Sequence, residues 1–420
     1  MTLPPLTDEQ LDERFEPIYE RIAQGAIERE QQRALAHEPV QWLKDTGFTA
    51  LRVPRRYGGG GVTLPQFFRQ LSKLGAADSN LPQILRAHFG FIEYRLEDRD
   101  ETQRARWFER IAAGETLGAA TSERTNKTHN SAVLRRDAST GALRLDGEKY
   151  YSTGALYADW LSVAAHDDES DLTLVIAANS PGVSRLDDWD GFGQRLTASG
   201  TTRFESVPVT PDAIISRYRA SEPRRNSSLT AFYQTVHLAT LAGIVQAVLR
   251  DSVEFVQGRT RTFGVAGQSS PRDNPLVHRV VGRLASLGYS TRAIVDAVAH
   301  GLERLHERRA EGEAQGGKTA DEYIALDIEA YEAQQIVIEQ TLEATTLMFE
   351  VGGASATSET RRFDRHWRNA RTIASHNPAG QREAAIGNFH LNAAPPEERF
   401  SLPHAPQAVP DEAAQSVAQA

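Results

Sequence analysis

The spacing of apolar residues changes twice along this chain, and these changes limit the folds that it can adopt. Residues 8–110 repeat apolar side chains at helical intervals, starting with Leu11 and Phe15. From about residue 116, segments such as "LTLVIAAN" alternate apolar and polar residues between turn signals, which is typical of strands. From about residue 225, helical spacing returns in two stretches of twenty or more residues. The sequence therefore predicts helices, then a β insert, then long helices that pack on one another.

These changes also set the domain boundaries that we expect. A helical domain covers residues 1–115, a β domain covers 116–222 and a second helical domain covers 223–393. The last segment, 394–420, is rich in Pro, Ala and Gln and is predicted to be a flexible tail. The fold class is therefore α+β.

Local signals refine this outline. Thr7 and Gln10 predict a capping box at the start of the first helix. Gly114 is expected to end the helix that precedes the β region. The four glycines at 58–61 suggest a phosphate-binding loop, but Val62 stands where such a loop needs a lysine. We expect a structural turn there.

The composition excludes several classes of function. The 420 residues include no cysteine, which excludes disulfides, thiolate nucleophiles and Cys-ligated metals. The net charge of −9 disfavours nucleic acid as a partner, because phosphates are bound by an excess of Lys and Arg. The twelve histidines show no metal-ligand spacing, so we expect no metal site. The acidic N-terminus lacks signal-peptide order and the apolar stretches look shorter than the roughly 20 residues of a membrane span, so we expect a cytoplasmic protein without a membrane segment.

Three residues outside these patterns each allow two interpretations. His88, in "RAHFGF", lies among aromatic residues and is either a hydrogen-bonded core histidine or a catalyst. Arg259 and Arg261, in "GRTRTFG", follow a long helix. They either hold a phosphate bidentately or form a solvated helix end.

The segment 363–378, "FDRHWRNARTIASHNP", carries three arginines and two histidines. Asp364 is placed to pair with Arg368 one helical turn later, and arginine stripes of this kind are usually solvated. His376 is different, because it comes just before Pro378, where the helix must stop. Such a junction often presents its side chains to a pocket.

Six segments in a fixed order resemble the acyl-CoA dehydrogenase superfamily, over roughly residues 10–392. They are "VPRRYGGGGV" (53–62), "TSERTN" (121–126), "LDGEKYYSTGALYADW" (145–160), "GFGQRLTASGTTRFESVPV" (191–209), "RTRTFG" (259–264) and "FEVGGASATSETRRFDRHWRNAR" (349–371). The resemblance implies an N-terminal helical domain, a middle β-barrel domain and a C-terminal four-helix bundle, usually assembled as a homotetramer.

Within the superfamily, the turn after residue 374 separates two kinds of chemistry. Dehydrogenases usually carry a catalytic glutamate in this turn, where the present chain has Asn377, which cannot accept a proton from carbon. The segment is more similar to the flavin-dependent monooxygenases of this fold, a branch that includes dibenzothiophene monooxygenases and alkylsulfone or sulfinate monooxygenases. That resemblance implies reduced FMN, supplied by a separate NAD(P)H:flavin reductase, and O2, which together form a C4a-hydroperoxyflavin that oxygenates a small organic substrate at sulfur, nitrogen or aromatic carbon. FAD is the second choice of cofactor, and the alternatives are an FAD-dependent acyl-CoA dehydrogenase and a non-catalytic helical scaffold.

The resemblance also assigns roles to individual residues. It implies that His88, Thr153 and His376 are catalytic, with the two histidines flanking the oxygen-reaction cavity. Arg261, with Arg259 as second choice, would hold the flavin phosphate across a subunit interface. The implied cofactor-binding residues are Ala119, Ala120, Thr121, Ser122, Tyr151, Ser152, Trp189, Arg259, Arg261, Gly352 and Gly353.

Overall fold

The computed structural model describes residues 6–98, 100–124, 132–219, 221–222, 224–259, 270–315, 320–397 and 399–403. Helices precede the sheet. They are α1 (Asp8–Gln24), α2 (Ala26–Gln32), α3 (His37–Asp45), α4 (Leu64–Ala77), α5 (Asn80–Ile84), α6 (Arg86–Glu97) and α7 (Glu101–Ala112). The predicted capping box is present at α1, because the Thr7 hydroxyl accepts from the Gln10 N–H and the Gln10 side chain accepts from the Thr7 N–H.

The glycine-rich turn before α4 is structural. Gly58 and Gly61 have φ angles of 88° and 58°, which favour glycine. A Cβ on Gly59 would lie 2.2 Å from the Val53 carbonyl oxygen, so the backbone itself fills the space. Gly114, with a φ of 94°, ends α7 as predicted.

A sheet follows α7. Its strands are β1 (Leu117–Ala120), β2 (Val133–Arg136), β3 (Leu143–Lys149), β4 (Trp160–His166), β5 (Asp171–Ala177), β6 (Val183–Arg185), β7 (Thr202–Val209) and β8 (Ile214–Tyr218). Their order is β6-β7-β3-β2-β4-β5-β8, with β1 parallel to β4. Every second residue of β4 is buried, as the alternating sequence predicts. These side chains, with those of the neighbouring strands, form a core separate from that of the helices.

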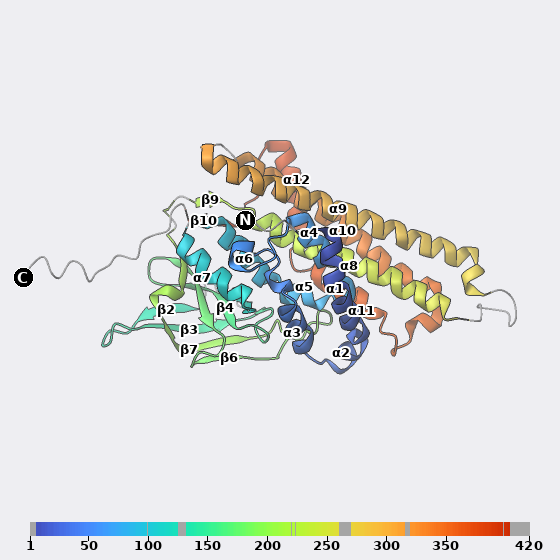
Figure 1. Ribbon diagram of the computed structural model, residues 1–420, viewed down its shortest axis with the longest axis horizontal. Helices are drawn as coiled ribbons and strands as arrows, with labels where there is room; N and C mark the ends of the chain where they lie inside the picture. Colours follow the sequence, from blue (N-terminus) through green and yellow to red (C-terminus); the bar gives the residue numbers. More distant parts are fainter. Residues whose placement is uncertain are drawn as a thin grey trace, which may run out of the picture.

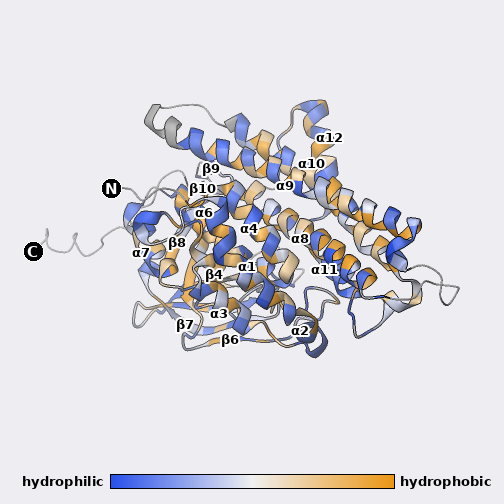
Figure 2. Ribbon diagram, turned by 45° about the vertical axis from the view of Figure 1, so that its right-hand side comes forward, coloured by the Kyte–Doolittle hydropathy of each residue, from blue (hydrophilic) through white to orange (hydrophobic). Residues whose placement is uncertain are grey.

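Long helices complete the fold after the short strand β9 (Arg224–Asn226). They are α8 (Leu229–Gln257), α9 (Pro275–Gln315), α10 (Ala320–Leu347), α11 (Asp364–Ala374) and α12 (Ala379–Asn392). Helices α8, α9 and α10 lie side by side, and α4 packs against α8 (Figure 1). The sheet lies at one end of this bundle, and Figure 2 shows apolar residues along much of α8.

Helix α8 corrects one expectation from the sequence. Among the described helices it alone has the length and hydropathy of a membrane span, and 83% of that stretch is buried inside the protein. A helix that is apolar on all sides is also what the centre of a large bundle requires, and this is where α8 lies.

The start of the predicted flexible tail is ordered. Ser401–Pro403 form strand β10, which pairs with β9 in antiparallel orientation. Arg399 binds the buried carboxylate of Asp327, and the Phe400 ring lies 5.1 Å from the Tyr233 ring. Residues 404–420, the rest of the predicted tail, lie outside the described residues.

Candidate active site

Two predicted cofactor segments meet at the edge of the sheet. The Ala119 N–H donates to the Thr153 carbonyl, and the Tyr150 N–H donates to the Ser122 carbonyl, both at 3.0 Å. Thr121 and Ser122 are exposed just beyond the end of β1. The end of β1 and the turn after β3 therefore form one surface.

Aromatic rings border this surface, while two of the predicted side chains lie beneath it. The Tyr151 side chain is 46% exposed, and its ring lies 6.1 Å from the ring of Trp189. Ala120 is fully buried in the core of the sheet, so only its backbone can face a cofactor. The Ser152 hydroxyl is buried and has no hydrogen-bond partner among the described residues.

A chain of hydroxyl groups fixes the direction of the Thr153 proton. The Thr197 hydroxyl donates to the Gln194 carbonyl at 2.8 Å, since a carbonyl can only accept. Ser199 must then donate to Thr197, at 2.7 Å, and Thr153 to Ser199, at 2.8 Å. The Thr153 oxygen is left with lone pairs to offer a donor.

The same turn packs directly on the helices. A Cβ on Gly154 would lie 2.3 Å from the Ile84 carbonyl oxygen, so this close approach requires glycine. The neighbouring Gln83 side chain accepts from His237 Nε2 at 3.1 Å. The His237 ring lies 4.4 Å from the ring of His376. The sheet turn and the turn after α11 are therefore linked through α5 and α8.

His376 is held in one orientation by its neighbour. Its Nδ1 lies 3.1 Å from Asn377 Oδ1, and Asn377 Nδ2 donates to Gln234 Oε1 at 2.7 Å. The side-chain nitrogen of Gln334 donates to the Asn377 carbonyl at 3.1 Å. Because Asn377 Oδ1 accepts from Nδ1, His376 Nε2 keeps its lone pair.

The surroundings of His376 favour its neutral form. Loss of solvation, and then the nearby Arg86 guanidinium, lower the pKa of His376 to about 4, although the residue is exposed in the single chain. The pKa of His237 is also well below its usual range, because the side chain is buried and Arg86 lies close. His237 and Arg86 are absent from the sequence-based prediction. A histidine inside an apolar helix is a signal that points to His237.

His88 does not join this group in the structure. Its Nε2 donates to the Thr49 carbonyl at 2.8 Å, and its Nδ1 accepts from the Leu117 N–H at 3.3 Å. Its side chain is fully buried. With both ring nitrogens bound to backbone, the geometry favours the core interpretation of His88, and we propose a structural role for it.

A second group of predicted cofactor residues lies beyond the far end of α8. Arg259 Nη1 donates to the Gly352 carbonyl at 3.4 Å. A Cβ on Gly352 would lie 2.1 Å from the Phe255 ring, and Gly353 has a φ of 54°. Arg261 lies outside the described residues.

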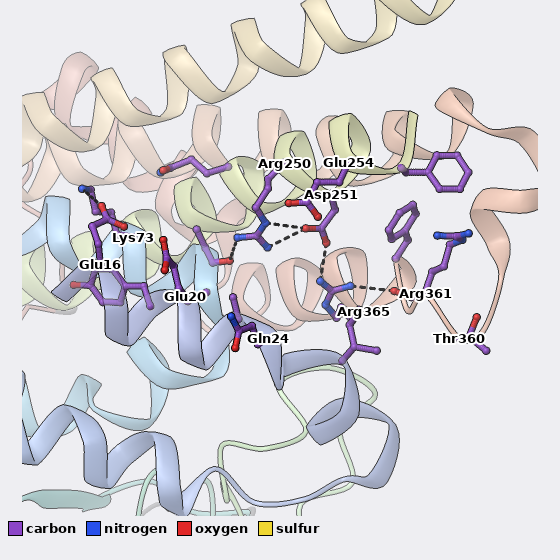
Figure 3. Close-up of a pocket in the computed structure, with 18 residues that line it drawn as sticks. Glu16, Glu20, Gln24, Lys73, Arg250, Asp251, Glu254, Thr360, Arg361 and Arg365 are labelled. Carbon is purple, nitrogen blue, oxygen red and sulfur yellow. Dashed lines mark hydrogen bonds and ion pairs between the residues drawn. The ribbon is translucent and has the colours of Figure 1, made fainter. Parts of the chain in front are cut away.

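A cavity of about 1000 Å3 opens beside this second group (Figure 3). Arg365, expected from the sequence to be solvated, is only 8% exposed there and binds Asp251 at 2.7 Å. His366 also binds Asp251, at 2.8 Å. Burial opposes the charge of Asp251, yet the hydrogen bond from His366 and the adjacent arginines hold the pKa of this carboxyl well below its usual range. The predicted pair of Arg368 with Asp364 is present at 2.8 Å.

The sheet turn and the arginine and glycine group lie toward opposite ends of α8. His237 and Gln257 are separated by twenty residues of α8, which corresponds to roughly 30 Å at the rise of an α-helix. Figure 1 shows the sheet near one end of α8 and the connection from α10 to α11 near the other.

Helices, a central sheet and a helical bundle, in this order, define the acyl-CoA dehydrogenase-like fold. Family models for the acyl-CoA dehydrogenase N-terminal and C-terminal domains match residues 9–115 and 235–380. The chain belongs to the acyl-CoA dehydrogenase superfamily.

Comparison with known proteins points to one branch of this superfamily. The chain is 28% identical over 391 residues to a dibenzothiophene monooxygenase of Mycolicibacterium goodii, covering 90% of this chain and 91% of the relative. It is 27% identical over 387 residues to SfnC of Pseudomonas putida, a probable FMNH2-dependent monooxygenase, covering 90% and 94%. The crystal structure of FMN-bound TdsC from Paenibacillus sp. A11-2 superimposes with a TM-score of 0.83 at 24% identity, over 91% of this chain and 98% of that one.

Proposed function

We propose that the protein is a two-component monooxygenase, which uses reduced FMN and O2 to oxygenate a small organic substrate at a sulfur, nitrogen or aromatic carbon centre. The turn after α11 carries the proposal. Asn377 replaces the carboxylate of the dehydrogenases there and orients a neutral His376. The names of the relatives, a dibenzothiophene monooxygenase and an FMNH2-dependent monooxygenase, support the same function. Reduced flavin, when bound, supplies the oxygen chemistry, and the protein supplies orientation and dryness.

The sheet surface fits a reduced flavin. Reduced flavin carries an N–H at N5, which needs an acceptor. The Thr153 oxygen offers one, because its own proton is directed toward Ser199. Tyr151 and Trp189 present rings that can contact a flat ring system.

His376 acts as a hydrogen-bond acceptor in this proposal. Its Nε2 lone pair can hold the proton of an oxygen that lies between flavin and substrate. Asn377 keeps the other ring nitrogen protonated, and Gln234 in turn fixes the Asn377 amide. A cationic histidine would not accept, so the lowered pKa of His376 serves this role.

We infer that the cofactor site is completed by a second subunit. Arg259, Gly352 and Gly353, with Arg261 two positions further along the chain, would bind the FMN phosphate of the neighbouring chain. A homotetramer, as in the family, would provide this contact. Exposed apolar side chains on α9 and α12 are available for it, with Leu276 70% and Leu391 83% exposed. An NAD(P)H:flavin reductase would supply the reduced flavin in the cytoplasm.

The test is oxygen incorporation. We would incubate purified protein with FMN, NADH, a general flavin reductase and 18O2, in the presence of thioethers, amines or phenols. Mass spectrometry then measures the masses of the products. We expect one labelled oxygen in the product of at least one class. Unlabelled substrates throughout, with all O2 recovered as hydrogen peroxide, would contradict the proposal.

One observation favours the dehydrogenase as second candidate. The buried carboxyl of Asp327 has its pKa raised to about 6 by burial, as a general base requires. Arg399 already binds it, however, and this makes it the weaker interpretation. Bleaching of bound FAD by an acyl-CoA would support the dehydrogenase.

A further inference from the structure

Arg86, at the start of α6, is a half-buried cation with no counter-ion among the described residues. Its Nε donates to the Tyr233 carbonyl at a long 3.4 Å, and neither Nη atom has a partner among the described residues. Other arginines of the helical core are paired, such as Arg52 with Glu93 at 2.7 Å. The terminal N–H groups of Arg86 are therefore available to a ligand that can accept from them.

The fold builds a support for this guanidinium. Its carbon lies 4.5 Å from the centroid of the Tyr233 ring. Gly90, one helical turn after Arg86 on the same face of α6, leaves the space that this ring fills, since a Cβ there would lie 2.1 Å from Tyr233 Oη. Phe400 of the tail packs on the ring as well, at 5.1 Å. The guanidinium is therefore fixed on an aromatic surface, with its terminal N–H groups unused.

Arg86 lies beside the group that the proposed function uses. The Tyr233 ring that carries Arg86 lies one turn of α8 before His237, and the His237 ring lies 4.4 Å from the His376 ring. The guanidinium also lowers the pKa of both histidines. Burial lowers the pKa of Arg86 itself to about 10, so the guanidinium remains charged at neutral pH. Both histidines are neutral there and cannot balance the charge. The side-chain oxygen of Gln334 (Oε1) is buried and has no partner among the described residues. Gln334 is the residue whose side-chain nitrogen binds the Asn377 carbonyl.

We propose that Arg86 binds the anionic group of the substrate, and that the substrate is a small organic anion such as a sulfinate, sulfonate or carboxylate. A guanidinium that stacks on a ring keeps its N–H edge free, and that edge matches two oxygens of such a group. A fully neutral substrate would leave Arg86 both desolvated and unpaired. The inference rests on the proposed function, because it places this anion next to His376.

The test compares anions with neutral molecules of similar shape. Calorimetric titration of the full-length protein with oxidised FMN uses three pairs: methanesulfinate with dimethyl sulfoxide, benzenesulfinate with methyl phenyl sulfoxide, and benzoate with benzamide. We expect the anion of at least one pair to bind tenfold tighter or more. In Arg86→Met this preference disappears, and in Arg86→Lys part of it remains. Arg292→Met, which removes an exposed arginine on α9, controls for net charge and leaves the preference unchanged.

Two results would overturn the inference: equal affinity within all three pairs in the wild type, or a preference for anions that survives in Arg86→Met. If Arg86→Met does not fold, the preference for anions is compared between the wild type and Arg86→Lys, and an unchanged preference in Arg86→Lys overturns the inference. Gly90→Ala is a further check, because it displaces the Tyr233 ring and should weaken anion binding while leaving the charge of Arg86 in place.

The oxygen-labelling experiment separates this inference from the proposed function. Labelled product without any preference for anions contradicts the role of Arg86 alone. Anion binding that depends on Arg86, with no labelled product from any substrate, contradicts the monooxygenase alone.

Discussion

At the turn after α11, Asn377 uses its side-chain oxygen for His376 and its side-chain nitrogen for Gln234. An amide has these two functions and no basic one, so the residue can orient a histidine but cannot deprotonate carbon. The sequence singled out His376 and Asn377 as the residues expected to decide the chemistry, and the structure places their side chains in contact. The sequence could not predict that His237 on α8 contacts His376, because the two are 139 positions apart in the chain and meet only after the bundle packs.

The role of His376 predicts a loss of coupling in His376→Ala. Without its acceptor, the activated oxygen should be released as hydrogen peroxide, and product per reduced flavin should fall roughly 100-fold, at the low end of what acid–base groups contribute. A peroxidase-linked assay beside product analysis measures both. His390→Ala, at an exposed histidine on α12, is the control. Unchanged coupling in His376→Ala would exclude the role.

His88 makes a prediction about stability and pH. Burial lowers the pKa of His88 to about 4, below the value in the unfolded chain. The contribution of His88 to the free energy of unfolding is therefore complete above pH 6.5 and is lost as the pH falls toward 4. By pH 5 the loss is about 2 kcal/mol. His88→Gln cannot titrate, so its free energy of unfolding should fall less than that of the wild type between pH 7.5 and 5. Denaturant titrations at both pH values measure this, and equal losses would refute the assignment.

At the scale of elements, α8 runs from the surroundings of His376 to the second group of predicted cofactor residues. Its N-terminal half carries Gln234 and His237, and its C-terminal end leads to Arg259. Periodicity predicted this helix, and the capping box at Thr7 could also be predicted, because both depend on residues close in sequence. The pairing of β10 with β9 could not be predicted, since it joins segments 177 residues apart.

The tail contact predicts a pH-dependent effect of Arg399→Met. At pH 8 the buried Asp327 carboxylate would lose its partner, and the free energy of unfolding should fall by about 3 kcal/mol. The pKa of Asp327 is already raised to about 6, and removal of Arg399 raises it further. At pH 5 the carboxyl is then neutral in the folded state, so the loss should be smaller. Asp327→Asn combined with Arg399→Met should restore part of the stability at pH 8, and an identical loss at both pH values would contradict this account.

At the scale of the whole molecule, we propose that the two groups of predicted cofactor residues form one site where two chains meet. The sequence implied both groups through the family's motifs, and the length of α8 between His237 and Gln257, roughly 30 Å, favours a site shared by two chains. The cavity beside the arginine and glycine group is lined partly by Arg361 and Phe255. Oligomeric assembly is thus part of the proposed cofactor site.

Mixed assemblies test this prediction. Ser122→Trp should block the sheet surface, and Arg259→Ala with Arg261→Ala should remove the phosphate contacts; each variant alone should bind FMN at least tenfold more weakly. Co-expressed and purified through two different tags, mixed assemblies should regain tight FMN sites, because each contact between unlike subunits combines one intact sheet surface with one intact arginine loop. Fluorescence titration measures the affinity, and no recovery would indicate that each site lies within one chain.

The central claim is that this chain controls the reaction of reduced flavin with oxygen. The most direct measurement is anaerobic mixing of the protein with photoreduced FMN, followed by stopped-flow absorbance after O2 is added. The account predicts a distinct intermediate spectrum that outlasts the oxidation of free reduced FMN and then gives oxidised flavin. Oxidation at the rate of free flavin, with no intermediate, would contradict it.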